Sequence, residues 1–197
     1  MALGTATVAY ELRFDSGRTC LDLLATTHPV ERLDSVTVLC AWITRAGLVP
    51  DGTPLTHADA SWLVGFRELR GRVGQLVPGG LAPEGRPYDV ALARVNEIAR
   101  AAPPAPRAVP GEDGALVREL AGPPACEALL GAVARDVVEL LTDPVARAGL
   151  RQCEGDNCPI VYLDTSRGRR RRWCSSEVCG NRERVARHRR RAALARA

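Results

Sequence analysis

Apolar residues recur every three or four positions along most of the first 150 residues, the spacing that places them on one face of a helix. The helices that this pattern predicts cover residues 17–27, 35–46, 60–73, 90–101 and 126–141. The first should stop before His28-Pro29, because the residue before a proline avoids the helical conformation. A short last helix, or else a linker, should begin at Asp143-Pro144 and lead to Arg151.

Short polar side chains mark where these helices should begin and end. Asp34 or Ser35 can cap the second helix, which Gly47 would close. The stretch Thr56–Asp59 resembles a capping box with Asp in the Glu position, so it should start the third helix. Asp89 can cap the fourth helix. Each cap would satisfy backbone N–H groups that the first helical turn leaves unpaired.

Only a few short stretches show the patterns of strands. Residues Tyr10–Phe14 alternate between polar and apolar and predict a strand, and two extended runs around Gly111–Gly114 predict a hairpin. Helices with a few short strands place the chain in the α+β class. A change of composition near residue 150 predicts two domains, a mainly helical one at residues 1–149 and a small module at residues 150–197.

Four of the seven cysteines stand close together near the C-terminus. Their pattern is C-x4-C, fifteen residues, then C-x4-C, from Cys153, Cys158, Cys174 and Cys179. Two short-spaced pairs joined by a longer excursion are typical of one zinc ion bound by four thiolates. Such a site has no open position, so the zinc should be structural rather than catalytic. Two disulfides or an iron–sulfur cluster are the alternatives.

The rest of the chain indicates a reducing compartment, where paired thiols are more often metal ligands than disulfides. The first fourteen residues have no basic region followed by a long apolar one, so we expect no signal peptide. No apolar run approaches the roughly 20 residues of a membrane helix. We therefore expect a cytoplasmic protein that makes no membrane contact. Cys20, Cys40 and Cys126 stand alone in apolar surroundings and should be small core residues.

The residues around the two cysteine pairs predict a compact zinc finger. Turn formers at Gly155–Asn157 and Pro159 suit a loop that presents two sulfur atoms to one ion. Residues 160–164 alternate as a strand, and residues 169–173 should return beside it as a second strand. A helix should follow Cys179, and Trp173 should pack beneath the zinc site. A loop, a hairpin, a second cysteine pair and a helix form a treble-clef-like plan.

Arginine is concentrated in the same module, and the chain has no lysine. Residues 151–197 hold thirteen arginines and five acids, a net charge of +8, which leaves −4 for the first 150 residues. Like charges this dense repel one another unless a polyanion such as nucleic acid relieves them. The alternative is a solvated basic face. The candidate nucleic-acid-binding residues are Arg167, Arg169, Arg170, Arg171, Arg172, Asn181, Arg182, Arg184, Arg187, Arg189, Arg190 and Arg191.

At these residues the sequence resembles a known family. The segment LDTSRGRRRRWCSSEVCGNR resembles the CGNR zinc-finger family, and the likeness extends over residues 150–192. Upstream, FDSGRTCLDLLATT and VTVLCAWITRAGL are similar to the ABATE domain that accompanies this finger. That domain usually has Asn-Thr after its Leu-Asp segment, where this chain has Thr26-Thr27.

The resemblance implies a bacterial, stress-induced transcription regulator that binds double-stranded DNA through its finger at the nucleoid. The N-terminal domain would then sense an effector or form a homodimer, and both the effector and the oligomeric state are left open. Gly180 should allow a tight turn into the last helix, and Asn181 should cap that helix or bond a base edge. Arg182 should pair with Asp164, or else contact nucleic acid.

Three other functions are weighed against this one. An RNA- or ribosome-associated module could use the same basic surface, although single-strand binding usually needs stacking aromatics, and only Tyr162 and Trp173 are available. A protein-docking module is a further alternative for the finger. An enzyme is not expected, because no motif or spacing links the candidate groups in the N-terminal domain. These groups are Asp22, His28, Asp34 and His57.

Overall fold

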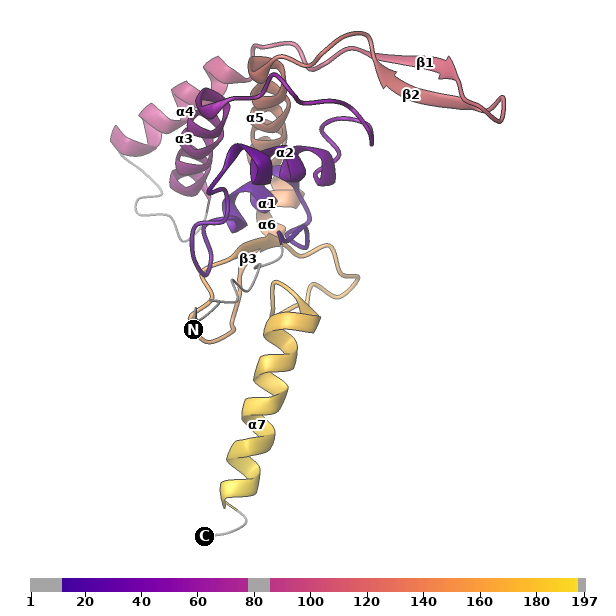
Figure 1. Cartoon of the computed structure of the whole chain (residues 1–197). Helices are drawn as coiled ribbons and strands as arrows, with labels where there is room; N and C mark the ends of the chain where they lie inside the picture. The colour runs from indigo at the N-terminus through magenta and orange to yellow at the C-terminus, as the bar shows by residue number, and fades with distance from the viewer. Residues whose placement is uncertain (1–11, 78–85, 195–197) are drawn as a thin grey trace, which may run out of the picture.

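The computed structural model describes residues 12–77 and 86–194 and confirms an α+β fold with a mainly helical N-terminal region. The elements are α1 (Thr19–Ala25), α2 (Val36–Arg45), α3 (Ala60–Leu76), α4 (Arg86–Ile98), β1 (Pro106–Pro110), β2 (Leu116–Leu120), α5 (Cys126–Thr142), α6 (Pro144–Gly149), β3 (Leu150–Gln152), β4 (Val161–Leu163), the π-helix η1 (Ser176–Gly180) and α7 (Asn181–Leu194). Figure 1 shows α1 to α6 gathered in one body, while the β1–β2 hairpin and α7 project from it in different directions. No helix in the described ranges is long and apolar enough to cross a membrane.

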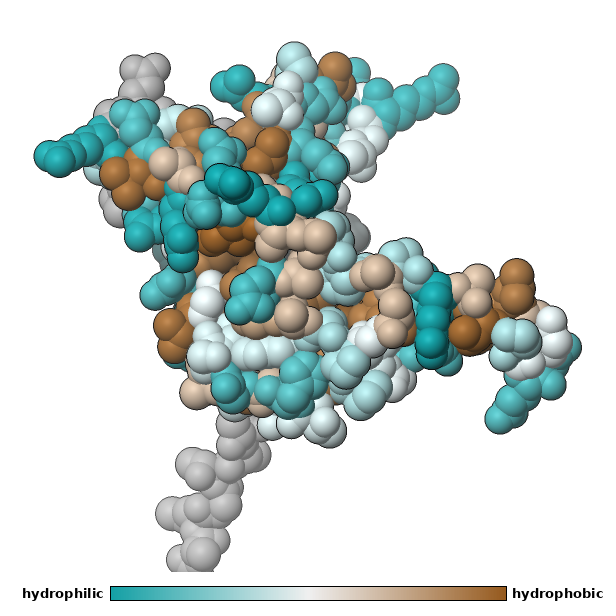
Figure 2. Space-filling view, turned by 90° about the horizontal axis from the view of Figure 1, so that it is seen from above, coloured by the Kyte–Doolittle hydropathy of each residue, from teal (hydrophilic) through white to brown (hydrophobic). Residues whose placement is uncertain are grey.

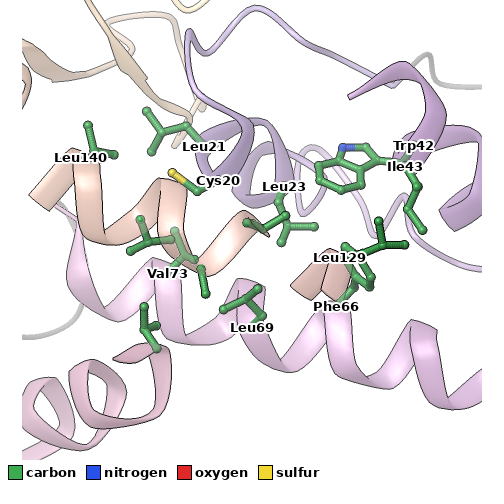
Figure 3. Packing of buried hydrophobic residues seen from close by; sticks show 14 of the residues in the cluster. Cys20, Leu21, Leu23, Trp42, Ile43, Phe66, Leu69, Val73, Leu129 and Leu140 are labelled. Atoms are coloured by element: carbon green, nitrogen blue, oxygen red, sulfur yellow. The ribbon is translucent and has the colours of Figure 1, made fainter. Parts of the chain in front are cut away.

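We call residues 150–194 the finger and the described residues before them the N-terminal body. The core of this body lies where α1, α2, α3 and α5 meet, as Figure 3 shows. Phe66 and Val73 of α3 lie in it with Leu129 of α5, and all three are fully buried. Trp42 of α2 packs against Phe66 with its ring centroid 5.8 Å away. Cys20 is buried among these side chains as predicted, whereas Cys40 and Cys126 are only partly buried.

The helices follow the sequence pattern closely, but two of the predicted caps are wrong. Ser35 does cap α2, because its hydroxyl accepts a hydrogen bond from the backbone N–H of Val38 at 3.3 Å. Thr56 does not cap α3, since the carboxylate of Asp59 accepts from the N–H of Ser61 at 2.8 Å and is itself the cap. Asp89 lies inside the first turns of α4, which already includes Arg86.

The β1–β2 hairpin forms as predicted and projects from the helices of the N-terminal body (Figure 1). Val109 pairs with Val117 in an antiparallel register, and Gly114 in the connecting turn has a φ of 79° that favours glycine. Hydrophobic and hydrophilic residues both lie along this arm in the view from above (Figure 2), and Leu116 is exposed. Of the predicted strand at Tyr10–Phe14, the first two residues lie outside the described part of the chain, and the remaining three form no strand.

The predicted pairing of residues 160–164 with 169–173 is wrong. β4 pairs instead with β3, in the antiparallel register Leu150↔Leu163, Arg151↔Tyr162 and Gln152↔Val161. Residues 169–173 are not a strand, and Arg169 has a φ of 47°, in the left-handed region. Side-chain hydrogen bonds, rather than backbone pairing with a neighbouring strand, fix the position of this segment, as described below.

The short β3–β4 sheet joins the finger to the N-terminal body. Leu150, Val161 and Leu163 belong to the main core cluster, and the N–H of Leu163 donates to the carbonyl of Ser16 at 2.8 Å. Gly17 makes this approach feasible, because its φ is 84° and a Cβ there would lie 3.2 Å from the carbonyl oxygen of Leu163. The domain boundary at residue 149/150 stays a prediction, but the two regions share packing across it.

Asp22 holds the turn at Ser16, whose carbonyl accepts a hydrogen bond from β4. A buried carboxylate at this position should lower the stability of the fold at neutral pH. Its carboxylate accepts a hydrogen bond from the N–H of Ser16 at 2.9 Å, and burial raises the pKa of Asp22 to about 6. A folded-state pKa above the unfolded value means that folding favours the protonated form. That stabilisation is present at low pH and is lost as the pH rises through 6. At pH 7 the buried charge therefore destabilises the fold.

We predict that Asp22→Asn raises the free energy of unfolding at pH 7 by about 1–2 kcal/mol, because the amide keeps an acceptor without the charge. Denaturant unfolding of the zinc-loaded protein between pH 8 and pH 5 should show the gain shrinking as the pH falls. Asp34→Asn removes the same charge from an exposed position and should change little. A gain that is independent of pH would contradict the assignment.

Candidate metal centre and nucleic-acid interface

The four predicted ligands come together in one buried cluster. All four sulfur atoms of Cys153, Cys158, Cys174 and Cys179 lie within 4.8 Å of one another. The Sγ of Cys174 is 3.7 Å from that of Cys158 and 3.6 Å from that of Cys179. Tetrahedral zinc with bonds of about 2.3 Å separates its sulfur ligands by about 3.8 Å, so the donor set fits one structural zinc ion. A disulfide needs sulfur atoms about 2.05 Å apart, and a multi-iron cluster needs them farther apart because they bind different irons.

The first pair of ligands lies on the loop that connects β3 to β4. The N–H of Cys153 donates to the carbonyl of Ile160 at 2.9 Å, which continues the strand pairing into the loop. Asn157 has a φ of 54°, which suits the tight turn. A Cβ at Gly155 would lie 3.2 Å from the Cβ of Cys179. The absence of a side chain at Gly155 therefore lets the second pair of ligands approach the first.

The second pair lies at the start of the C-terminal helices. The hydroxyl of Ser175 caps η1 by accepting from the N–H of Val178 at 3.4 Å, and Cys179 follows within η1. The predicted tight turn at Gly180 is wrong, because Gly180 lies inside η1. A Cβ there would make only ordinary contacts, the nearest at 3.5 Å from Trp173. Asn181 directs its side-chain oxygen to Arg184, which donates to it.

Hydrogen bonds and one cation surround the sulfur atoms. The Sγ of Cys153 accepts from the N–H groups of Gly155 at 3.4 Å and Cys174 at 3.3 Å. The guanidinium of Arg13, from the N-terminal body, donates to the Sγ of Cys174 at 3.3 Å. Such outer contacts stabilise thiolates and orient them toward a metal. Without a metal, burial and the neighbouring Cys174 raise the pKa of Cys179 to about 11, so zinc binding must release protons.

Arg171 acts inside the finger rather than at its surface. Its guanidinium lies over the ring of Tyr162, with 4.5 Å from Cζ to the ring centroid. The same group donates to the carbonyl oxygens of Trp173 at 2.8 Å, of Asp15 at 2.8 Å, and of Cys174. Arg171 therefore fixes the segment before the second cysteine pair and ties it to the N-terminal body. Sequence alone offered no signal for this role, because Arg171 stands in an unbroken run of arginines.

Asp164 and Tyr162 also hold the segment at residues 169–173, which was predicted to be a strand. The buried carboxylate of Asp164 accepts from the N–H groups of Ser166 at 2.9 Å and Arg171 at 3.0 Å, and the bonds from Ser166 hold the pKa of Asp164 below its usual range. The hydroxyl of Tyr162 donates to the carbonyl of Arg171 at 2.5 Å. The predicted ion pair of Asp164 with Arg182 does not occur in the described part of the chain.

Both aromatic side chains that could stack on bases are covered. Tyr162 is fully buried beneath Arg171. Trp173 packs against the cysteine cluster as predicted, and the guanidinium of Arg172 lies over it at 5.3 Å from the ring centroid. Arg172 also forms an ion pair with Glu154 at 2.6 Å. These residues therefore stabilise the finger.

The other candidate residues lie on the surface of the finger. Arg167, Arg169 and Arg170 are exposed on the turn before Arg171. The six arginines of α7 are exposed too, and they are Arg182, Arg184, Arg187, Arg189, Arg190 and Arg191. Arg190 pairs with Glu183 at 2.8 Å. His188 is also exposed on α7.

The four groups considered for catalysis do not form one cluster, since the four cysteines are the only group of three or more Cys, His, Asp or Glu ligands within metal-binding reach in the described residues. Asp22 holds the Ser16 turn. Nε2 of His57 lies 2.8 Å from the carbonyl oxygen of Pro124, and its ring packs on Trp62. His28 lies beside Pro29 at the edge of a hollow described below, and Asp34 is exposed.

We predict one zinc ion per chain and its loss on substitution of a ligand. Elemental analysis of Cys174→Ser should show reduced zinc, because three thiolates leave one tetrahedral position to a weaker donor. Cys40→Ser, at a cysteine outside the cluster, should retain the metal. Wild-type protein without zinc and with two disulfides by mass spectrometry would contradict the assignment.

We also predict that two neighbouring arginines differ sharply. Arg171→Ala should lower the free energy of unfolding by about 1–3 kcal/mol and speed zinc release to a chromogenic chelator, because three carbonyl groups lose their donor. Arg170→Ala removes the same charge at an exposed position and should leave both quantities near wild type. Equal effects of the two substitutions would contradict the structural role of Arg171.

Comparison with known families agrees with this architecture. The ABATE family, described as "Putative stress-induced transcription regulator", matches residues 17–144, and the CGNR zinc finger matches residues 150–192. A search of the curated proteins found no match. The first match covers more than half of the chain, and the second contains all four clustered cysteines. The chain therefore belongs to the ABATE family and ends in a CGNR zinc finger.

Proposed function

We propose that this protein is a DNA-binding transcription regulator whose zinc finger presents α7 to duplex DNA. The observation that carries the proposal is that α7 projects from the body and is strongly positively charged. The helix extends away from the body (Figure 1), and it bears six arginines against one acid, Glu183. Its 14 residues span about 21 Å, and the DNA major groove admits a helix of this kind.

The packing of α7 gives a reason to expect a polyanionic partner. None of its described side chains is fully buried, so little apolar packing supports the helix. The guanidinium groups of Arg187, Arg189 and Arg191 have no ion-pair or hydrogen-bond partner within residues 12–77 and 86–194. Phosphate groups would relieve the repulsion among these cations and release counterions from the DNA.

One face of α7 is better placed than the others to contact DNA. Arg184, Arg187 and Arg191 are spaced by three and four residues and so share one face of the helix. Arg182 lies on nearly the opposite side of the helix from this face. It lines a hollow between α7 and the N-terminal body. The Arg184–Arg187–Arg191 face is therefore directed away from the body at the base of α7, and we assign the main phosphate contacts to it.

The covered aromatic side chains favour duplex DNA over single-stranded RNA. Single-strand binding relies on aromatic rings that stack on bases. Tyr162 is buried under Arg171, and Trp173 is covered by Arg172. The finger thus offers a cationic helix without a stacking platform, which supports the DNA reading against the RNA-associated alternative.

The N-terminal body completes the proposal as the part that does not bind DNA. Its region of the sequence carries a net charge of −4, which would repel phosphate. We assign it a sensory or dimerising role in a bacterial stress response, with the regulator acting at the nucleoid in the cytoplasm. In this proposal residues 1–149 and 150–197 are the regulatory and DNA-binding domains.

We predict that the full chain binds random duplex DNA with strong salt dependence. Fluorescence anisotropy across salt concentrations should give a slope of log affinity against log salt of about −4 to −7, because each neutralised phosphate contributes roughly 0.9. The double variant Arg187→Gln/Arg191→Gln should flatten the slope by about 2 and weaken all sequences alike.

The double variant Arg94→Gln/Arg100→Gln provides the charge-matched control, since Arg94 of α4 and Arg100, which follows α4, are both exposed in the N-terminal body. It should behave as wild type. Equal losses in the two double variants would show that only net charge matters. Absence of binding to any nucleic acid would overturn the proposal and leave the finger as a protein-docking module.

A further inference from the structure

A second candidate binding site lies where the N-terminal body meets the finger. A hollow of about 490 Å³ opens between the segment before α1, the start of the loop between α1 and α2, the end of α2, and the η1–α7 junction. This volume is within the range of sites for small molecules. Its charged lining consists of Arg13, Arg32, Arg45 and Arg182, with Asp15 and Glu177.

The charges of this lining favour an anion. Four arginines against two carboxylates leave a net charge of +2, which a phosphate ester dianion would balance. His28 lies at the same hollow, and its pKa is lowered by burial and then by the nearby charges of Arg13, Arg182 and Arg32. The positive charges of three guanidinium groups from separate parts of the chain therefore all reach the imidazole of His28.

Several of these arginines have donors to spare. The Nε of Arg13 is buried and has no acceptor in the part of the chain that the structure describes. Arg45 is exposed, and its guanidinium lies over the ring of Phe14 with 4.8 Å from Cζ to the centroid. This stacking does not use its N–H groups, so they can donate hydrogen bonds to a ligand. Arg182 is exposed and has no carboxylate partner among the described residues. Planar guanidinium groups arranged in this way suit the oxygen atoms of a phosphate.

We propose that this hollow binds a small organic phosphate. The phosphate would lie among Arg13, Arg45 and Arg182. The apolar side chains of Leu12, Phe14 and Val178, which also line the hollow, would contact the organic part. The lining is thus divided between charged groups that suit a phosphate and apolar side chains that suit an organic moiety.

The site couples the body to the finger, and this step rests on the proposed DNA-binding function. One wall belongs to the N-terminal body, and the other belongs to the segment around Cys179 and the base of α7. Arg13 also donates to the zinc ligand Cys174, so it contacts both the hollow and the metal centre. A bound phosphate would neutralise Arg182 at the base of the DNA-binding helix, which lowers the positive potential that attracts DNA phosphate groups. By linkage, DNA and the ligand should then weaken each other's binding.

The test uses adenosine 5′-monophosphate as the phosphate probe and adenosine as its uncharged control. Calorimetry with the full-length, zinc-loaded protein at constant ionic strength should show binding of the monophosphate and none of adenosine. Arg45→Gln should weaken the monophosphate about tenfold, because it removes a charge-assisted contact. Arg100→Gln, an exposed arginine that does not line the hollow, should bind as wild type. Arg182→Gln provides a second variant from the opposite wall.

The outcomes separate the possible sources of the phosphate. Binding that depends on Arg45 and Arg182 supports the site even if the protein binds no DNA, in which case only the proposed function fails. Failure of the monophosphate to bind at millimolar concentration overturns the site. Equal affinities in Arg45→Gln and Arg100→Gln also overturn it. If Arg45→Gln weakens duplex DNA but not the monophosphate, the hollow receives a DNA phosphate, and the small-ligand proposal is wrong.

Discussion

Four sulfur atoms within 4.8 Å of one another impose the central constraint on this chain. As thiolates they would repel strongly in a buried site, and as neutral thiols they would give no strong interaction in return for their burial. A zinc ion resolves the conflict because it binds four thiolates in a tetrahedron with about this separation between the sulfur atoms. The finger has little else to hold it, since its own buried cluster contains the four cysteines with only a few larger side chains. The direction of α7 therefore depends on the metal.

Arginine has two different uses in the finger, and the chemistry of the side chain suits both. The planar guanidinium of Arg171 donates hydrogen bonds to three backbone carbonyl groups. The flat face of the same group covers the ring of Tyr162. A lysine could neither stack nor reach these acceptors together. On α7 the same side chains extend into solvent with few partners. The dense positive charge is thus partly internal structure, and the number of arginines in the sequence overstates the surface available for nucleic acid.

Sequence patterns predicted the features that depend on local periodicity or on metal chemistry. The helices appeared where apolar spacing placed them, and the four cysteines met as their spacing implied. The predicted strand pairing within the finger was wrong, because a three-residue strand has almost no periodicity and its partner is decided by packing. β3 was hidden between a short helix and the first cysteine, yet it pairs with β4. Arg13 and Arg171 could not be recognised either, because their roles arise from contacts with Cys174 and Asp15, far away in the sequence.

The same long-range contacts argue against a finger that hangs from a flexible linker. Leu150, Val161 and Leu163 lie in the main core, while Ala25 of α1 belongs to the cluster around the zinc ligands. A displacement at α1 or at the segment before it would therefore reach the metal centre through packed side chains and through Arg13. Chains of packed side chains of this kind can carry energetic coupling between distant parts of a protein. In this chain the contact is made by the β3–β4 sheet and the arginines beside it, while α7 projects away from the body (Figure 1).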